Sequence, residues 1–237
     1  HQPHKTQLKR KNILKKIKIM KSNYTHIAIL LDRSGSMTSI QKDVINGLDL
    51  FIEEQRKLDG DCTVSLMQFD GVTEYLNEFE SMVSFKFDKS KYMPRGNTAL
   101  VDSMVKLIKD TGTKLASMNE EDRPEKVLFI VVTDGEENSS VEYSSEQLKA
   151  LVEEHENVWK WSFSYIGANQ DAFSVAGRYG ISSSKVVNYT ATSGGTGNAF
   201  ATLSKMSSRA RSMSTMDYMA TGATFTEEEQ EAGNSVK

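Results

Sequence analysis

The residues best suited to chemistry stand together directly after an apolar segment. The run Ile27–Leu31 is followed by Asp32, Ser34 and Ser36, which form an Asp-x-Ser-x-Ser pattern around Gly35. A carboxylate and two hydroxyls are the oxygen ligands that hard divalent cations such as Mg2+ prefer. Glycine suits a turn that aims two hydroxyls at one point, because it lacks a Cβ. The same pattern also fits helix capping, in which Asp or Ser side chains accept from free backbone N–H groups.

Two further segments carry oxygen ligands at comparable places. Thr98 lies in a Gly-Asn-Thr-Ala segment just before a helical pattern, and Asp134 ends the apolar segment EKVLFIVVTD. In open α/β sheets, ligands bind in the crevice at the carboxyl ends of the strands, where these segments are expected. Capping explains Asp32 and the serines but predicts no further hydroxyl at Thr98, so the combination favours a metal site.

The elements that must position these groups alternate between short apolar runs and segments of helical period. This alternation is typical of a mainly parallel sheet covered by helices on both faces, an α/β fold of three layers with Rossmann-like topology. Gly71 suits a turn into one antiparallel edge strand. The predicted strands are Tyr24–Asp32, Cys62–Phe69, Thr73–Phe79, Glu125–Asp134, the segment WKWSFSYIGAN and Lys185–Tyr189. The predicted helices carry their apolar residues within 40–52, 99–115, 148–155, 169–176 and 200–213.

Several local features are predicted as well. The spacings of Thr38 with Gln41 and of Ser144 with Gln147 predict capping boxes. Alternating aromatic residues in WKWSFSYIGAN indicate a strand less covered on one face. Asn169 is the expected cap of the short helix after that strand. The remaining expectations are a loop over Thr190–Gly197, rich in Ser, Thr and Gly, and a solvated Arg33.

The order and spacing of the three oxygen-bearing segments resemble the metal-ion-dependent adhesion site (MIDAS) of von Willebrand factor A (vWA) domains. That family combines Asp-x-Ser-x-Ser, a separate Thr and an Asp at the end of a later strand, and the resemblance covers about Tyr24 to Met213. It implies a vWA domain over residues 22–213. The phrases RPEKV, TDGEEN and GANQDAF look similar to small single-domain bacterial and phage proteins of this type.

The resemblance also implies a ligand set. Ser34, Ser36 and Thr98 would supply hydroxyl ligands, and Asp32 and Asp134 would act directly or through water. Mg2+ takes about six oxygen ligands and keeps several waters, and neutral hydroxyls leave most of its charge unneutralised. An Asp or Glu of a partner protein can then complete the coordination sphere. We therefore expect a non-enzymatic, metal-dependent protein-binding domain that uses Mg2+, or Mn2+ in its place.

The alternative function is a Mg2+-dependent phosphatase or phosphotransferase of the haloacid dehalogenase type, which also begins with an Asp after an apolar strand. That chemistry uses a nucleophilic carboxylate backed by a second Asp two positions later. Ser34 occupies that position, so the general-acid partner is missing and the sequence favours binding.

Charge and cysteine content limit the partners and the compartment. Residues 1–21 hold eight Lys or Arg and no acid, which leaves 21 basic against 32 acidic residues in the rest of the chain. An acidic body disfavours nucleic acid as a partner, because that binding needs a basic surface. No apolar run approaches the roughly 18–20 residues of a membrane span, so the membrane is not expected as a partner of this part of the chain. The single cysteine, Cys62, fits a reducing, cytoplasmic compartment.

The two ends of the chain are expected to differ from the body. Residues 1–21 lack the apolar core of a secretory signal and are predicted to be a disordered basic extension. The alternative is an arm that touches membrane or nucleic acid and itself carries the binding role. Residues 214–237 are predicted to be a polar, flexible tail.

Overall fold

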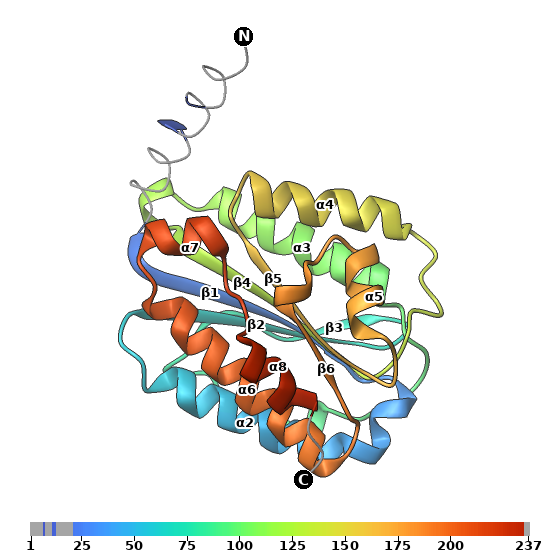
Figure 1. Ribbon diagram of the computed structural model, residues 1–237. Helices are drawn as coiled ribbons and strands as arrows, with labels where there is room; N and C mark the ends of the chain where they lie inside the picture. Colours follow the sequence, from blue (N-terminus) through green and yellow to red (C-terminus); the bar gives the residue numbers. More distant parts are fainter. Residues whose placement is uncertain (1–6, 8–10, 13–20, 235–237) are drawn as a thin grey trace.

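One six-stranded sheet organises the chain in the computed structural model, which describes residues 7, 11–12 and 21–234 (Figure 1). The strand order is β3-β2-β1-β4-β5-β6, with β3 antiparallel at one edge and the other strands parallel. This confirms the predicted fold class. The strands are β1 (Lys21–Asp32), β2 (Asp61–Phe69), β3 (Thr73–Ser81), β4 (Pro124–Thr133), β5 (Ser162–Ala168) and β6 (Val186–Tyr189).

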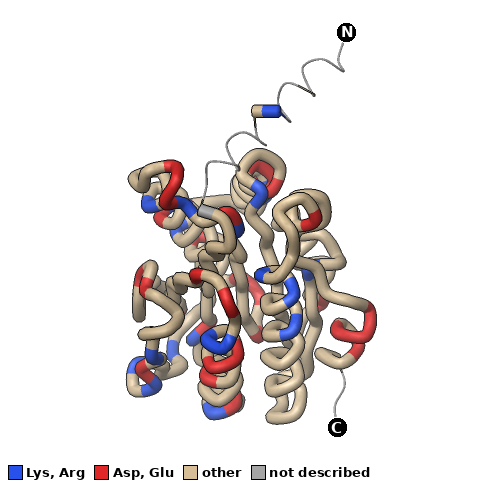
Figure 2. The backbone as a smooth tube through the Cα atoms, turned by 90° about the vertical axis from the view of Figure 1, so that its left-hand side faces the viewer, with Lys and Arg blue, Asp and Glu red and all other residues tan. Residues whose placement is uncertain are grey.

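Helices cover both faces of this sheet (Figure 1). One face carries α2 (Gln41–Arg56) and α6 (Ser193–Ser212), and the other carries α3 (Leu100–Ser117), α4 (Ser145–Asn157) and α5 (Ala172–Arg178). Figure 2 shows Lys and Arg interspersed with Asp and Glu over the outer helices and loops. In the described part of the chain, no helix has both the length and the apolar composition to cross a membrane.

The apolar run of β1 follows from this layering. Ile27, Ile29 and Leu31 pack into the core under α2 and α6, whereas Ala28 and Leu30 pack into the core under α3 and α4. Successive side chains of a strand point to opposite faces, so a strand covered on both faces is apolar at every position. The apolar run of β1 thus agrees with its place between β2 and β4, where helices cover both faces.

Close packing of α2 against α6 depends on glycine. A Cβ on Gly47 of α2 would lie 2.4 Å from a ring carbon of Phe200 on α6, so no larger residue fits there without movement. The predicted loop over Thr190–Gly197 is wrong, because α6 already begins at Ser193. Gly195 sits inside the first turn of α6, where a Cβ would lie 2.0 Å from the Thr190 carbonyl oxygen.

The two predicted capping boxes had different outcomes. Ser144 and Gln147 form the reciprocal hydrogen bonds of a capping box at the start of α4, as predicted. Thr38 does not cap α2, because a 3₁₀ turn over Gly35–Ile40 precedes this helix and the Thr38 hydroxyl donates to the Gly35 carbonyl at 2.7 Å. The 3₁₀ turn thus uses the side chain that the sequence had assigned to the cap.

Two predictions around β5 also need correction. Every residue of β5 is buried, although the alternating aromatic pattern predicted one less covered face. The strand lies between β4 and β6 and under helices on both sides, so its polar serines are enclosed with its aromatics. The cap of α5 is Asp171, whose carboxylate accepts from Ser174 N, and not Asn169.

The predicted flexible tail over 214–237 is wrong for the residues up to 234. They form α7 (Thr215–Thr221) and α8 (Glu227–Asn234), and both Tyr218 and Phe225 are buried in the core. The Tyr218 hydroxyl donates to the Val127 carbonyl at 3.0 Å. Residues 235–237 and most of the predicted extension over 1–21 lie outside the described residues, except that Lys21 already belongs to β1.

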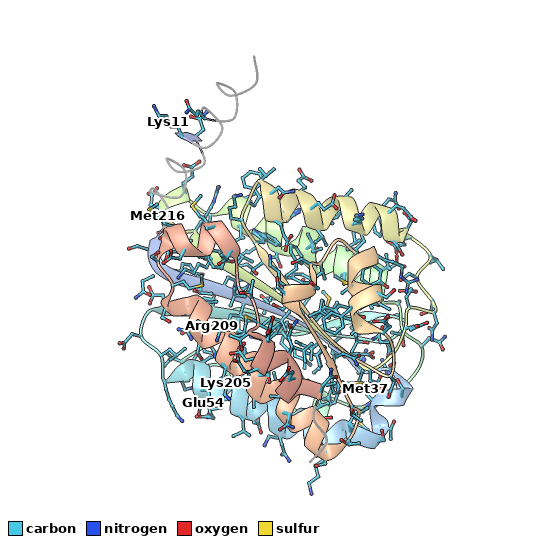
Figure 3. The ribbon with its side chains drawn as sticks, viewed as in Figure 1. Lys11, Met37, Glu54, Lys205, Arg209 and Met216 are labelled. Carbon is cyan, nitrogen blue, oxygen red and sulfur yellow. The ribbon has the colours of Figure 1, made fainter. Side chains whose placement is uncertain are left out.

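The last helix, α8, is fixed to α6 and to the edge strand β6. Arg209 of α6, labelled in Figure 3, donates to Glu229 of α8 at 2.6 Å. Gln230 of α8 donates to the Ser183 and Val186 carbonyls at 2.8 Å each. An edge strand has unpaired backbone groups that invite association with other chains, and α8 covers some of those of β6.

We predict that Phe225→Ala lowers the free energy of unfolding by about 3 kcal/mol, because truncating a buried Phe removes apolar burial and leaves a cavity. Met216→Ala is the matched control from the same predicted tail, since Met216 is 75% exposed and should change stability by less than about 0.5 kcal/mol. Urea unfolding followed by circular dichroism measures both. Equal free energies of unfolding for the two variants would mean that this segment does not pack against the core.

Candidate functional site

Four of the five predicted site residues meet at the carboxyl edge of the sheet. The Ser36 hydroxyl donates to Asp134 Oδ1 at 2.6 Å, and the hydroxyls of Ser34 and Ser36 lie 3.2 Å apart. The Ser34 backbone N–H donates to Asp32 Oδ1 at 2.6 Å. Because β1 and β4 are adjacent and parallel, the residues that follow them come together at this edge. Met37, labelled in Figure 3, lies in the 3₁₀ turn of the same edge.

The fifth residue, Thr98, is held beside them by contacts between loops. Gly35 N donates to the Gly96 carbonyl at 3.1 Å, which ties the Asp-x-Ser-x-Ser turn to the Gly-Asn-Thr-Ala segment. A Cβ built on Gly135 would lie 3.7 Å from the Ser36 hydroxyl and 3.9 Å from the Thr98 hydroxyl. These two hydroxyls therefore flank a common point next to Gly135, each at contact distance from it.

The loop after β4 clamps the start of α3 through two side chains. Thr98 N donates to the Asn138 side-chain oxygen at 2.9 Å, and Asn138 N donates to the Thr98 carbonyl at 3.0 Å. The Glu137 carboxylate accepts from Val101 N at 2.8 Å and from Ser139 N at 2.8 Å. An acidic acceptor at a helix N-terminus satisfies free N–H groups and interacts favourably with the helix dipole.

The two carboxylates of the site are almost completely enclosed, with 0% of Asp32 and 1% of Asp134 exposed. Burial raises the pKa of Asp32 to about 6, against the lowering effect of hydrogen bonds from Ser34 and Thr133, and the negative charge of Asp134 adds to the rise. Burial also raises the pKa of Asp134, and the hydrogen bond from Ser36 opposes this rise. The site therefore favours a nearby positive charge.

The residues fit a hard divalent cation. The candidate ligands are two carboxylates and three hydroxyls, all of them oxygen donors of the type that Mg2+ and Mn2+ select. Asp134 Oδ2 is buried and accepts no hydrogen bond from the described residues. A buried carboxylate oxygen without a donor is costly, and a cation would supply the missing partner.

Several residues that support the site were not assigned this role from the sequence. The Thr133 hydroxyl donates to Asp32 Oδ2 at 2.7 Å, and the buried Tyr92 hydroxyl donates to the Asp32 carbonyl at 2.8 Å. The Tyr189 hydroxyl is buried without a partner among the described residues, and its pKa is raised by burial and then by the charges of Asp134 and Asp32. Thr133 was visible in the same motif as Asp134, but no local pattern marks either tyrosine.

Arg33 is buried, although a solvated side chain was expected at this position. Only 4% of its surface is exposed, because it pairs with Asp70 through Nε at 3.2 Å and with Glu74 through Nη1 at 2.6 Å. Arg95 joins the same cluster, with its Nε 2.9 Å from Asp70 Oδ2. The guanidinium of Arg33 thus binds a charged cluster next to the candidate metal site.

Comparison with solved structures identifies the fold. A von Willebrand factor type A structure from Catenulispora acidiphila matches with a TM-score of 0.56 and 12% identity, over 78% of this chain and 43% of that chain. Proximal thread matrix protein 1 from the mussel byssus matches with a TM-score of 0.56 and 16% identity, over 78% of this chain and 46% of that chain. A variant of the minor pilin PilB from Streptococcus sanguinis matches with a TM-score of 0.56 and 11% identity, over 78% of this chain and 62% of that chain.

A further structure of the mussel protein has its MIDAS motif occupied by zinc. It matches with a TM-score of 0.52 and 15% identity, over 78% of this chain and 46% of that chain. This chain thus spans less than two thirds of the length of each of these proteins. No protein-family model matches the sequence, and no curated protein matches it.

The sheet order, the helices on both faces and the oxygen-rich carboxyl edge define an open, mainly parallel α/β protein with a candidate cation site. Within that class, the chain has the von Willebrand factor type A fold. The expected fold is therefore confirmed. The expected ligand set is brought together by the structure as described above.

We predict that Glu137→Ala lowers the free energy of unfolding by about 2 kcal/mol, because it removes an ionised acceptor from several backbone N–H groups. Glu136→Ala is the matched control, since Glu136 is the exposed neighbour of the same charge. Urea unfolding compares the two variants. If both variants lose the same stability, the clamp between this loop and α3 contributes nothing specific.

Proposed function

We propose that this chain binds one divalent cation, Mg2+ in the first instance, and through it an acidic residue of a partner protein. The observation that carries the proposal is that oxygen ligands from three loops come together beside Asp134, whose buried Oδ2 has no hydrogen-bond donor among the described residues. The proposed ligands are the hydroxyls of Ser34, Ser36 and Thr98, with Asp32 and Asp134 acting directly or through water.

Electrostatics supports a cation at this place. Burial raises the cost of ionising both Asp32 and Asp134, and the charge of Asp134 adds to the cost at Asp32. A cation between them would replace this repulsion by attraction, and attraction is stronger in a poorly solvated site than in water. The hydroxyl donors add coordination without adding negative charge, so the bound ion would stay electropositive toward solvent.

An acidic partner residue is the ligand that such an ion would attract. Gly35 and Ser36 are exposed, so the proposed ion would lie near the surface and not in a closed cage. A carboxylate from another protein could then displace a coordinated water and gain a charge-assisted contact. The zinc-occupied MIDAS motif of the mussel protein, which has the same fold, supports a divalent ion at this edge.

The choice of Mg2+ rests on the donor chemistry and on the compartment. Thiolate and imidazole ligands suit zinc, whereas carboxylates, hydroxyls and water suit Mg2+ and Mn2+. A cytoplasmic location, which we propose from the single, buried Cys62, is compatible with this choice. We accordingly assign the chain a binding role without catalysis.

Isothermal titration with Mg2+ and with Mn2+ tests the metal site. We expect one ion per chain, and we expect Ser34→Ala and Thr98→Ala each to weaken binding at least about ten-fold, since each removes an oxygen ligand. Ser39→Ala is the matched control, because Ser39 is an exposed hydroxyl residue of the same 3₁₀ turn and is not a proposed ligand. Unchanged affinity in Ser34→Ala and Thr98→Ala, or no binding by the wild type, would refute the proposed site.

The rival enzymatic function makes a separate prediction. With Mg2+ present, we expect no turnover of p-nitrophenyl phosphate above that of Asp32→Asn, because the residue two positions after Asp32 is Ser34 and supplies no general acid. Absorbance at a fixed wavelength follows the released nitrophenolate. Turnover by the wild type that Asp32→Asn abolishes would instead favour a phosphatase.

A further inference from the structure

A cleft of about 550 Å³ adjoins the candidate metal site and is not part of it. Its walls come from the turn between β2 and β3, from the start of β3 and from the segment before the Gly-Asn-Thr-Ala loop. The residues that matter for its chemistry are Arg33, Val72, Glu74, Lys91, Met93 and Arg95.

The cleft and the candidate metal site share their supporting loops. Arg33 stands between Asp32 and Ser34 in the sequence, so one turn contributes to both. Arg95 N donates to the Arg33 carbonyl at 2.7 Å, and Thr98 follows three residues later. A partner segment bound at the metal would therefore lie next to this cleft.

The charge of the cleft is opposite to that of the body. Three cationic side chains line it, from Arg33, Lys91 and Arg95, against the single carboxylate of Glu74. Even when the underlying Asp70 is counted, one positive charge remains, whereas residues 22–237 hold 21 basic and 32 acidic residues. The Arg95 side chain is 63% exposed and engages Asp70 through Nε, so its terminal nitrogens face solvent.

Apolar side chains stand beside these cations. Met93 is 65% exposed and Val72 is 59% exposed, and both belong to the lining of the cleft. Exposed apolar groups next to a cationic patch are typical of surfaces that bind protein segments, because they combine area for burial with charge complementarity. A phosphate or another small anion would gain nothing from Val72 and Met93.

We propose that this cleft binds a second acidic side chain of the same partner segment, next to an apolar side chain that packs between Val72 and Met93. The inference rests on the proposed function, in which a first carboxylate of that segment completes the coordination sphere of the metal ion. The metal accepts any accessible carboxylate, so the cleft supplies the choice among acidic partners. Lys91 and Arg95 are the specificity-determining residues.

A displayed peptide library with one fixed Asp and three random positions on either side tests this proposal in Mg2+. We expect the wild type to enrich peptides that carry an additional Asp or Glu together with an apolar residue. Synthetic peptides with and without the second acid are then compared by fluorescence anisotropy, and the second acid should tighten binding about five-fold, as two partly exposed ion pairs would.

The variants separate the cleft from the metal. The double variant Lys91→Gln/Arg95→Gln should lose the five-fold preference while its titrated affinity for Mg2+ stays unchanged, and Lys91→Gln alone should lose part of it. Lys89→Gln is the matched control, because Lys89 is an exposed lysine of the same short turn, pairs with Asp49 and does not line the cleft. It should keep the full preference.

Other results would overturn the inference in distinguishable ways. If Mg2+ binds and supports peptide binding but the double variant keeps the preference, the cleft proposal fails and the metal proposal stands. If the wild type binds no Mg2+, both fail. If millimolar inorganic phosphate displaces the peptide through Lys91 and Arg95 without Mg2+, the cleft is a small-anion site and the proposal is wrong.

Discussion

The enclosure of two carboxylates side by side is the constraint on which the functional edge depends. Asp32 ends β1 and Asp134 directly follows the adjacent parallel strand β4, so the fold itself brings them together away from water. Ionised groups in such a place are costly unless donors or a counter-charge surround them. Ser34, Ser36 and Thr133 supply donors, but Asp134 Oδ2 still has none among the described residues. A cation is the partner that would complete this arrangement.

The loops around the carboxylates are correspondingly fixed by bonds to one another. The turn after β1 is tied to the segment before α3 through Gly35 and Gly96, and the loop after β4 is tied to that segment through Asn138. Arg33 and Asp70 link the turn after β1 to the turn after β2. Oxygen ligands from three separate loops can define one ion site only if such contacts limit their relative movement.

The sequence predicted those features that local pattern determines. The apolar run of β1 indicated a strand covered on both faces. The Asp-x-Ser-x-Ser pattern, Thr98 and Asp134 indicated one edge of the sheet, because alternating strands and helices give parallel strands whose carboxyl ends share an edge. Ser144 and Gln147 predicted a cap that depends only on residues three apart. The strand and the cap depend on interactions that are near in sequence or repeat along the element, whereas the shared edge follows from the parallel direction of β1 and β4.

The wrong predictions concern residues whose environment is set by distant parts of the chain. Tyr218 and Phe225 are the only aromatics of a polar segment, and packing against the distant core beneath them makes that segment ordered. The glycine content of Thr190–Gly197 suggested a loop, but Gly195 lies in the first turn of α6, where glycine is needed because the Thr190 carbonyl leaves no space for a Cβ. Arg33 is buried because it pairs with Asp70 and Glu74, which belong to the hairpin formed by β2 and β3.

The acidic body has a further consequence for any acidic partner. Residues 22–237 carry 32 acids against 21 bases, so this part of the chain repels a negatively charged protein at long range, while the eight bases of residues 1–21 reduce the net charge of the whole chain to -3. At physiological ionic strength this repulsion is screened beyond about 8 Å, and the groups within that distance decide binding. A doubly charged ion and the cations of Arg33, Lys91 and Arg95 would then act together at one edge, against weak repulsion elsewhere. Such a distribution slows encounter but favours partners that place their acids at this edge, which gives selectivity at the cost of association rate.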